Sequence, residues 1–137
     1  ITKLKKDIGP KFTISMAPIQ TALQTDNPGV GGFSYKELYC SEVGKEIEYF
    51  NGQFYESYSQ EAYETVIDNG YPEQKIVMGM LMGQNFLKSV ETVKELYAEY
   101  GNNFGGVFIW EYLDAKSNID KTPEDWCVNI YNILNDN

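Results

Sequence analysis

Strand-like and helix-like hydrophobic patterns alternate along this chain. Short runs of β-branched and aromatic residues are typical of buried strands, and the segments between them carry apolar residues at spacings of three and four, which is typical of helices. The strands are expected at 11–17, 47–55, 75–81 and 105–112, and the helices at 34–43, 59–69, 86–100 and from 122 onward. This alternation predicts an α/β fold with a parallel sheet and right-handed crossovers.

The helix ends are marked by residues that favour starts and stops. Gly70, reinforced by Pro72, ends the second helix, and Gly101 ends the third. Thr122 precedes a proline at the first position of the last helix, which is the arrangement of a capping residue. The apolar residues of that last helix are expected to form one stripe, made of Trp126, Cys127, Ile130 and Leu134.

Two architectures fit this order of elements. One is a complete small doubly wound sheet, and the other is half of an eight-stranded barrel, which needs about 250 residues in full. Nucleotide-binding sheets usually carry a glycine-rich phosphate loop directly after the first strand. The glycines at 29–32 follow a long loop instead, so they give little support for a phosphate site. The pattern alone leaves both architectures open.

Composition narrows the possible chemistry. The 137 residues make one domain or part of a larger one, with no histidine, no arginine and a net charge of −9. A nucleic-acid surface would need a basic stripe, so this partner is excluded, as are histidine-based catalysis and imidazole-liganded zinc. No run of apolar residues is long enough to span a membrane, and no signal peptide is visible. Because the chain opens on Ile1, we expect a processed product or a piece of a longer protein.

The two cysteines are far apart in the sequence. Cys40 and Cys127 match no metal-binding spacing and both fall in expected helices. We therefore expect buried free thiols, and a disulfide has no support from the sequence.

Two strand ends carry residues that suit a ligand site. Along the second strand, Asn51, Gln53 and Tyr55 share one face, which becomes more polar toward the carboxyl end. Buried amides cost free energy unless they are paired, so they either satisfy one another or serve a ligand. The last strand ends on Trp110, which is placed either as the floor of a site or as a core residue.

Three motifs in order carry a family resemblance. These are the Ser-Met-Ala-Pro sequence at 15–18, the Gln-Phe-Tyr sequence at 53–55, and the Gly-Gly-Val at 105–107 that leads to Trp110. Together they resemble glycoside hydrolase family 18, the chitinase-type barrels, and their order matches strands five to eight of that fold. The resemblance implies that residues 1–137 are the C-terminal half of a (β/α)8 TIM barrel, to be completed by a missing N-terminal half.

The resemblance also implies roles for particular residues. Tyr55 would help to hold the N-acetyl group of the substrate, and Trp110 would form the apolar floor beneath the sugar. Gln53 and Met16 would line the same pocket. The implied substrate is a polymer containing N-acetylglucosamine, cleaved with the substrate's own acetamide as nucleophile, without a cofactor or a metal. A secreted protein is implied as well.

The sequence departs from the family pattern at several points. It contains no Asp-x-x-Asp-x-Asp-x-Glu motif, so the catalytic acid is expected outside this chain, and the chain alone is expected to be inactive. Glu56 stands where Asp or Asn is usual, and Ile19, followed by Gln20, stands where many members have Glu or Gln directly after the proline. Strand alternation turns Glu111 away from the face of Trp110, which favours a surface carboxylate.

Two other functions stay open on the sequence. One is a chitinase-like protein that binds carbohydrate without hydrolysing it, and the other is an independent doubly wound domain that handles a small molecule. An open half barrel would expose two sheet edges, which native proteins avoid, so a partner is expected for the barrel interpretation.

Overall fold

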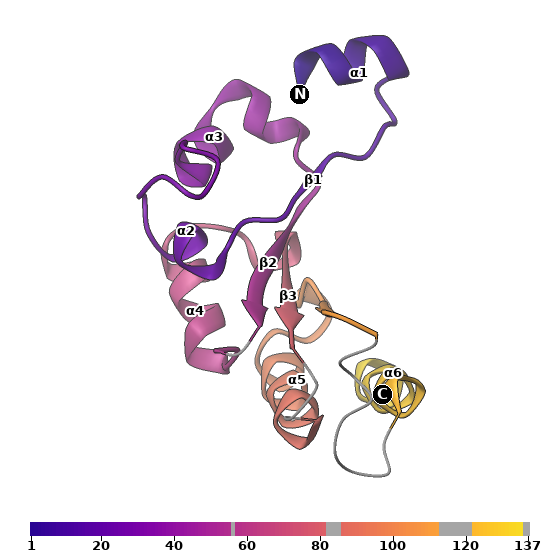
Figure 1. Ribbon diagram of the computed structural model, residues 1–137. Helices are drawn as coiled ribbons and strands as arrows, with labels where there is room; N and C mark the ends of the chain where they lie inside the picture. Colours follow the sequence, from indigo (N-terminus) through magenta and orange to yellow (C-terminus); the bar gives the residue numbers. More distant parts are fainter. Residues whose placement is uncertain (56, 82–85, 113–121, 136–137) are drawn as a thin grey trace.

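The computed structural model describes residues 1–55, 57–81, 86–112 and 122–135 (Figure 1). Its elements, in chain order, are α1 (Thr2–Ile8), β1 (Ser15–Met16), α2 (Gln20–Gln24), α3 (Tyr35–Cys40), η1 (Glu42–Glu46), β2 (Tyr49–Tyr55), α4 (Gln60–Asp68), η2 (Glu73–Lys75), β3 (Ile76–Met80), α5 (Phe86–Tyr100), η3 (Gly101–Asn103), β4 (Val107–Ile109) and α6 (Pro123–Asn135). Among these helices, none is long and apolar enough to cross a membrane.

The four described strands form one parallel sheet in the order β1-β2-β3-β4. In register, Phe50 lies beside Met16 on one side and Ile76 on the other, and Gly79 lies between Gln53 and Phe108. The prediction of a parallel sheet with strands adjacent in sequence order is confirmed. A doubly wound sheet reverses its strand order part-way, and these strands show no such reversal.

Helices including α2, α4 and α5 bury one face of this sheet. The side chains of β2 alternate between buried and half-exposed along its whole length, with Phe50 and Phe54 at most 1% exposed. They lie in a core with Tyr63 of α4 and Val93 and Leu96 of α5. We call this side the helix-covered face. Asn51, Gln53 and Tyr55 are only half-buried, and we call their side the open face.

Both outer strands are shorter than the sequence predicted. The strand expected at 11–17 is reduced to Ser15–Met16, and the one expected at 105–112 to Val107–Ile109. Each of these outer strands has a described neighbouring strand on one side only. Its hydrogen-bonded ladder therefore extends only over the residues that lie beside that neighbouring strand. Gly106, with φ of 105°, also breaks the extended backbone directly before β4.

The predicted helix caps are confirmed, whereas α1 and α2 lie outside the four helices that the pattern predicted. The Thr122 hydroxyl accepts a hydrogen bond from Asp125 N at 3.2 Å, and the Asp125 carboxylate accepts one from Thr122 N at 2.8 Å. Gly70 follows α4 with φ of 88°, as a helix stop requires. No pattern predicts α2, because five residues without a capping side chain show too little periodicity.

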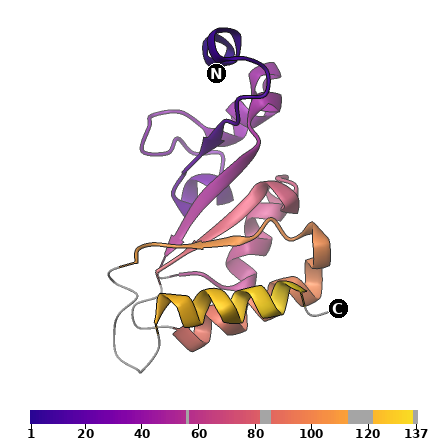
Figure 2. The ribbon, with the colours of Figure 1, turned by 90° about the vertical axis from the view of Figure 1, so that its right-hand side faces the viewer.

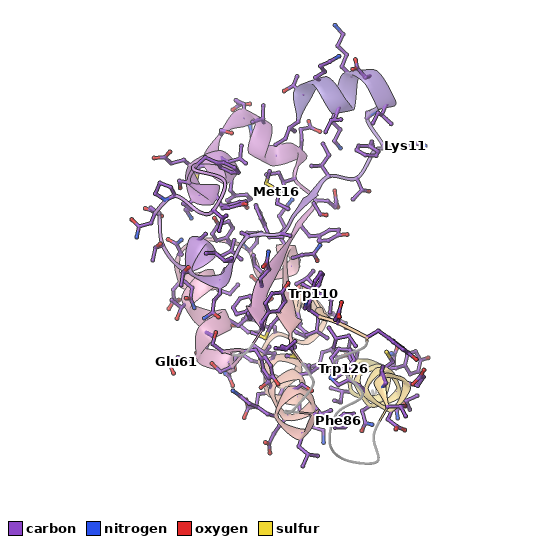
Figure 3. All side chains as sticks on the ribbon, viewed as in Figure 1. Lys11, Met16, Glu61, Phe86, Trp110 and Trp126 are labelled. Carbon is purple, nitrogen blue, oxygen red and sulfur yellow. The ribbon has the colours of Figure 1, made fainter. Side chains whose placement is uncertain are left out.

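Trp126 links the last two helices, α5 and α6, through a hydrogen bond. Its indole Nε1 donates to Ser89 Oγ at 2.8 Å between α6 and α5, where both views place the helices side by side (Figures 2 and 3).

Trp126 and Ile130 are buried, but Cys127 is exposed because consecutive helical residues point about 100° apart. Cys40 is exposed as well, so the expectation of buried thiols was wrong.

Tyr63 connects α4 to the start of two strands. Its side chain is fully buried, and its hydroxyl lies 2.8 Å from the Glu73 carbonyl oxygen and 3.1 Å from that of Ile76, to which it donates. Its ring also packs edge-on against Phe104, just before β4. One buried hydroxyl therefore satisfies backbone groups at the entry to β3.

Replacing Tyr63 by phenylalanine should destabilise the fold. The change leaves buried carbonyl oxygens without their donor, and we expect a loss of about 1–3 kcal/mol in the free energy of unfolding by urea titration. Tyr131→Phe is the matched control, since Tyr131 is 66% exposed, and it should change stability by less than about 0.5 kcal/mol. Equal stabilities of the two variants would contradict this role of the hydroxyl.

Stability should also fall in alkaline solution. Burial raises the pKa of Tyr58 to about 12, and it raises the pKa values of Tyr63 and Tyr71 as well. Unfolded tyrosines ionise near pH 10, so below about pH 10 these residues are neutral in both states and do not affect stability. Above it the unfolded state loses protons first, and each such tyrosine lowers the unfolding free energy by about 1.4 kcal/mol per pH unit until its folded pKa is reached. Ultraviolet titration of tyrosinate, run beside denaturant unfolding at each pH, tests this. Complete ionisation of all tyrosines in the still-folded protein near pH 10 would contradict it.

Candidate functional site

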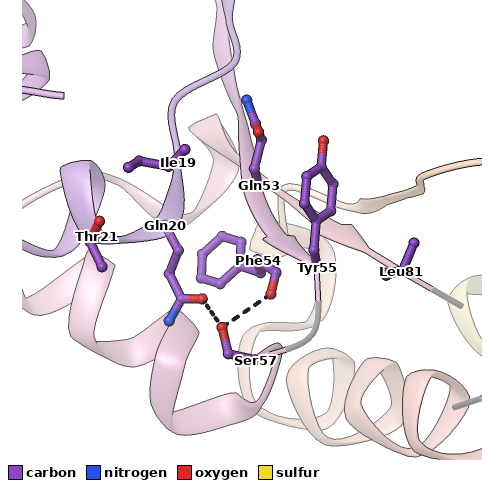
Figure 4. Close-up of a pocket in the computed structure, with 8 residues that line it drawn as sticks. All are labelled: Ile19, Gln20, Thr21, Gln53, Phe54, Tyr55, Ser57 and Leu81. Atoms are coloured by element: carbon purple, nitrogen blue, oxygen red, sulfur yellow. Dashed lines mark hydrogen bonds between the residues drawn. The ribbon is translucent and has the colours of Figure 1, made fainter. Parts of the chain in front are cut away.

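The candidate site lies at the carboxyl ends of the strands, on the open face. Gln53 and Tyr55 come from the end of β2, Leu81 follows β3, and Trp110 follows β4. The ends of parallel strands meet at one edge of a sheet, so these residues are brought together although they are far apart in the chain. Figure 4 shows the side chains of Gln53 and Tyr55 pointing to the same side of β2.

An irregularity in β2 sets the direction of Tyr55. Gln53 lies beside Gly79, but Tyr55 lies beside Met80, so β2 has one extra residue at this point. Tyr55 has a φ of 25°, which is uncommon for a residue with a side chain. Leu81 N donates to Tyr55 O at 3.2 Å and keeps the two strands together beyond the irregularity. Bulges of this kind redirect a side chain, and here Tyr55 stays on the open face although Met80 is buried.

Tyr55 and Trp110 form an aromatic pair. Their ring centroids are 6.2 Å apart, with the planes inclined at 37°, so the prediction that these side chains come together is confirmed. Trp110 N donates to Met80 O at 2.8 Å, which ties this residue to the end of β3, and the Trp110–Glu111 peptide bond is cis. The indole itself is 53% exposed and offers a flat apolar surface.

The polar groups beside this pair are hydrogen-bond donors. Burial raises the pKa of the Tyr55 hydroxyl, which is therefore protonated at neutral pH. The Gln53 amide nitrogen donates to Ala17 O at 2.6 Å, and this bond fixes the side chain next to β1. Both groups suit recognition of a neutral polar ligand, and neither releases a proton as readily as a carboxylic acid does.

A hollow of about 430 Å³ opens beside Tyr55 (Figure 4). Its lining residues come from the segment after β1, from the end of β2 and from Leu81 after β3: Ile19, Gln20, Thr21, Gln53, Phe54, Tyr55, Ser57 and Leu81. Ser57 Oγ donates to Gln20 Oε1 at 2.5 Å and joins the segment after β1 to the segment after β2. Tyr55 thus belongs to both the hollow and the aromatic pair.

Met16 does not join this group. It lies beside Phe50 in register, so its side chain points to the helix-covered face, where it packs against the core. Figure 3 also shows it well separated from Trp110 along the sheet. The expectation that Met16 lines the pocket is therefore corrected, because the offset between β1 and β2 gives it the wrong face. Glu111 is exposed, and Glu56 lies outside the described residues.

Phe108 is an open-face residue that sequence reasoning missed. It lies beside Gly79 in register and two residues before Trp110, so the two aromatic side chains of β4 and its extension share a face. Its parity with Trp110 was visible in the sequence, but its neighbour on β3 was not. In the described ranges no three side chains of cysteine, aspartate or glutamate gather as metal ligands would.

Among the solved structures that this chain resembles are two carbohydrate-cleaving enzymes. A fungal endo-β-N-acetylglucosaminidase from glycosyl hydrolase family 18 matches with a TM-score of 0.78 and 31% identity, over 98% of this chain and 50% of that chain. Over nearly its whole length, the chain is thus similar to a member of glycoside hydrolase family 18. A chitinase of Aspergillus fumigatus, ChiC, matches with a TM-score of 0.71 and 27% identity, over 95% of this chain and 50% of that chain. The chain thus spans about half the length of either enzyme, and no family model or curated protein sequence matches it.

Proposed function

We propose that residues 1–137 form the C-terminal half of a chitinase-like (β/α)8 barrel, with β1 to β4 as strands five to eight. The parallel order of the strands and their single helix-covered face support this, since barrel helices lie outside the strands. The match over half of two family 18 enzymes supports it as well. The other half of the barrel would then pair with the outer strands β1 and β4.

The proposed substrate is a polysaccharide containing N-acetylglucosamine. The main support for this substrate is the Tyr55–Trp110 pair. The exposed indole can stack on the apolar face of a sugar, while the protonated hydroxyl beside it donates a hydrogen bond to the acetamide oxygen of that sugar. Gln53 adds an amide on the neighbouring surface. We place these three residues in the sugar-binding site.

The proposed reaction is substrate-assisted hydrolysis. The acetamide oxygen attacks the anomeric carbon as the glycosidic bond breaks, an acid from the other half protonates the departing oxygen, and water then opens the cyclic intermediate. The Tyr55 hydroxyl would donate to the acetamide group and keep it in position for attack. This chemistry needs neither a metal nor an organic cofactor, and a polymeric substrate suits a secreted protein.

The second candidate, a chitinase-like protein that binds without cleaving, shares this sugar-binding surface. Turnover separates the two, because only the enzyme needs the acid. Release of reducing ends from a chito-oligosaccharide by the full-length protein supports hydrolysis. Tight binding without release supports the binding protein.

Truncating Trp110 should weaken sugar binding more than removing the Tyr55 hydroxyl. Trp110→Ala removes a large apolar surface and should cost part of the about 3–5 kcal/mol that truncating a buried aromatic residue costs. Tyr55→Phe removes one hydrogen bond, worth about 0.5–1.5 kcal/mol. Calorimetric titration of the full-length variants with an N-acetylglucosamine oligomer measures both.

Tyr49→Phe is the control for this comparison. Tyr49 is a half-buried tyrosine at the opposite end of β2, so its substitution should leave the affinity unchanged. Negligible losses for both Trp110→Ala and Tyr55→Phe would mean that neither side chain touches the sugar, and the proposed site would be wrong.

A further inference from the structure

Phe108 is a large aromatic side chain of β4 that does not contribute to the helix-covered core. Its neighbours Val107 and Ile109 pack against that core, whereas Phe108 lies on the open face and stays half-buried. In register it forms one row with Gly79 of β3 and Gln53 of β2. The row therefore runs from an aromatic ring, across a position without a side chain, to an amide.

Gly79 leaves the space into which this ring leans. A Cβ atom at Gly79 would come within 2.7 Å of Phe108 Cε1 and within 2.7 Å of the Gly52 carbonyl oxygen, distances that no side chain tolerates. The ring of Phe108 thus reaches across β3 toward β2. It gives the open face an apolar floor in a place where a larger residue on β3 would fill the space.

This floor lies next to the aromatic pair. Trp110 is two residues beyond Phe108, which separates their Cα atoms by roughly 7 Å along the chain. Donors stand around the floor, with the Gln53 amide in the same row and the protonated Tyr55 hydroxyl at the strand ends. A ligand group that fits this surface is apolar underneath and polar at its edge, as an acetamide group is with its methyl and its carbonyl.

We propose that Phe108, lying over Gly79, contacts the methyl of the substrate's N-acetyl group and makes acetylated chains bind better than deacetylated ones. The inference rests on the proposed sugar-binding function and adds a residue that determines specificity. Simple packing of the barrel interior by Phe108 predicts a different result, because lost packing weakens acetylated and deacetylated ligands alike.

The test compares two ligands on the full-length protein. Affinities for an N-acetylglucosamine oligomer and for the glucosamine oligomer of equal length are measured for wild type, Phe108→Ala and Phe108→Leu. We expect Phe108→Ala to lower the preference for the acetylated ligand about 10-fold, the size of one lost apolar contact in a pocket, and Phe108→Leu to keep most of it. Phe12→Ala, which truncates a 40% exposed phenylalanine outside this group, should leave the preference unchanged.

Each outcome decides the matter. An unchanged preference in Phe108→Ala, or an equal loss for both ligands, would overturn the role of Phe108 while the sugar-binding function stands. Failure of the wild type to bind either ligand would overturn the proposed function itself. A second measurement needs no variant: in wild type with ring-labelled phenylalanine, the acetyl methyl protons should show nuclear Overhauser contacts to Phe108, and their absence from the bound complex would also overturn the proposal.

Discussion

The alternation of side chains along β2 is the constraint on which the rest of this structure depends. Phe50 and Phe54 are buried on one side, among the aromatic and aliphatic side chains of the helices, and this burial fixes the register of the strand. A slip by one residue would expose both phenylalanines and bury Asn51 and Gln53, which costs apolar burial and leaves amides unpaired. The core thereby determines which residues reach the open face, and the site takes its position from packing on the opposite side.

The pairing of β2 with β3 becomes irregular where the candidate site begins. Between Gln53 and Tyr55 the register shifts, and Tyr55 adopts a backbone conformation with positive φ. Non-glycine residues in such conformations persist only when their surroundings hold them, and they gather at functional sites. The contact of Tyr55 with Trp110 and the hydrogen bond from Leu81 N provide that support on the side of β3 and β4. The irregular end of the strand is thus linked to both neighbouring strands.

Local patterns predicted the four strands and the site residues at the end of β2, because these features depend on residues close together in the chain. The faces of β2, the cap at Thr122 and the stop at Gly70 all follow from such short spacings. Contacts between strands depend on register, which no single strand encodes. Met16 was therefore assigned to the wrong face, and the overlap of Phe108 with Gly79 was not seen. The exposed Cys127 shows the same limit, since an apolar residue beside a buried tryptophan need not share its side of the helix.

Exposure to water limits the strength of the hydrogen bonds that the site residues can make to a ligand. Trp110 is 53% exposed and Tyr55 and Gln53 are half-buried on the open face, so water competes for each donor. Hydrogen bonds and charges become stronger as water is excluded, which the proposed other half of the barrel would do by covering this face. The sugar would then be held between surfaces with separate tasks. This half would supply stacking and neutral donors, and the other would supply the acid. An acid set in such a dry cleft has its pKa raised by desolvation and stays protonated near neutral pH, as proton donation to a leaving group requires.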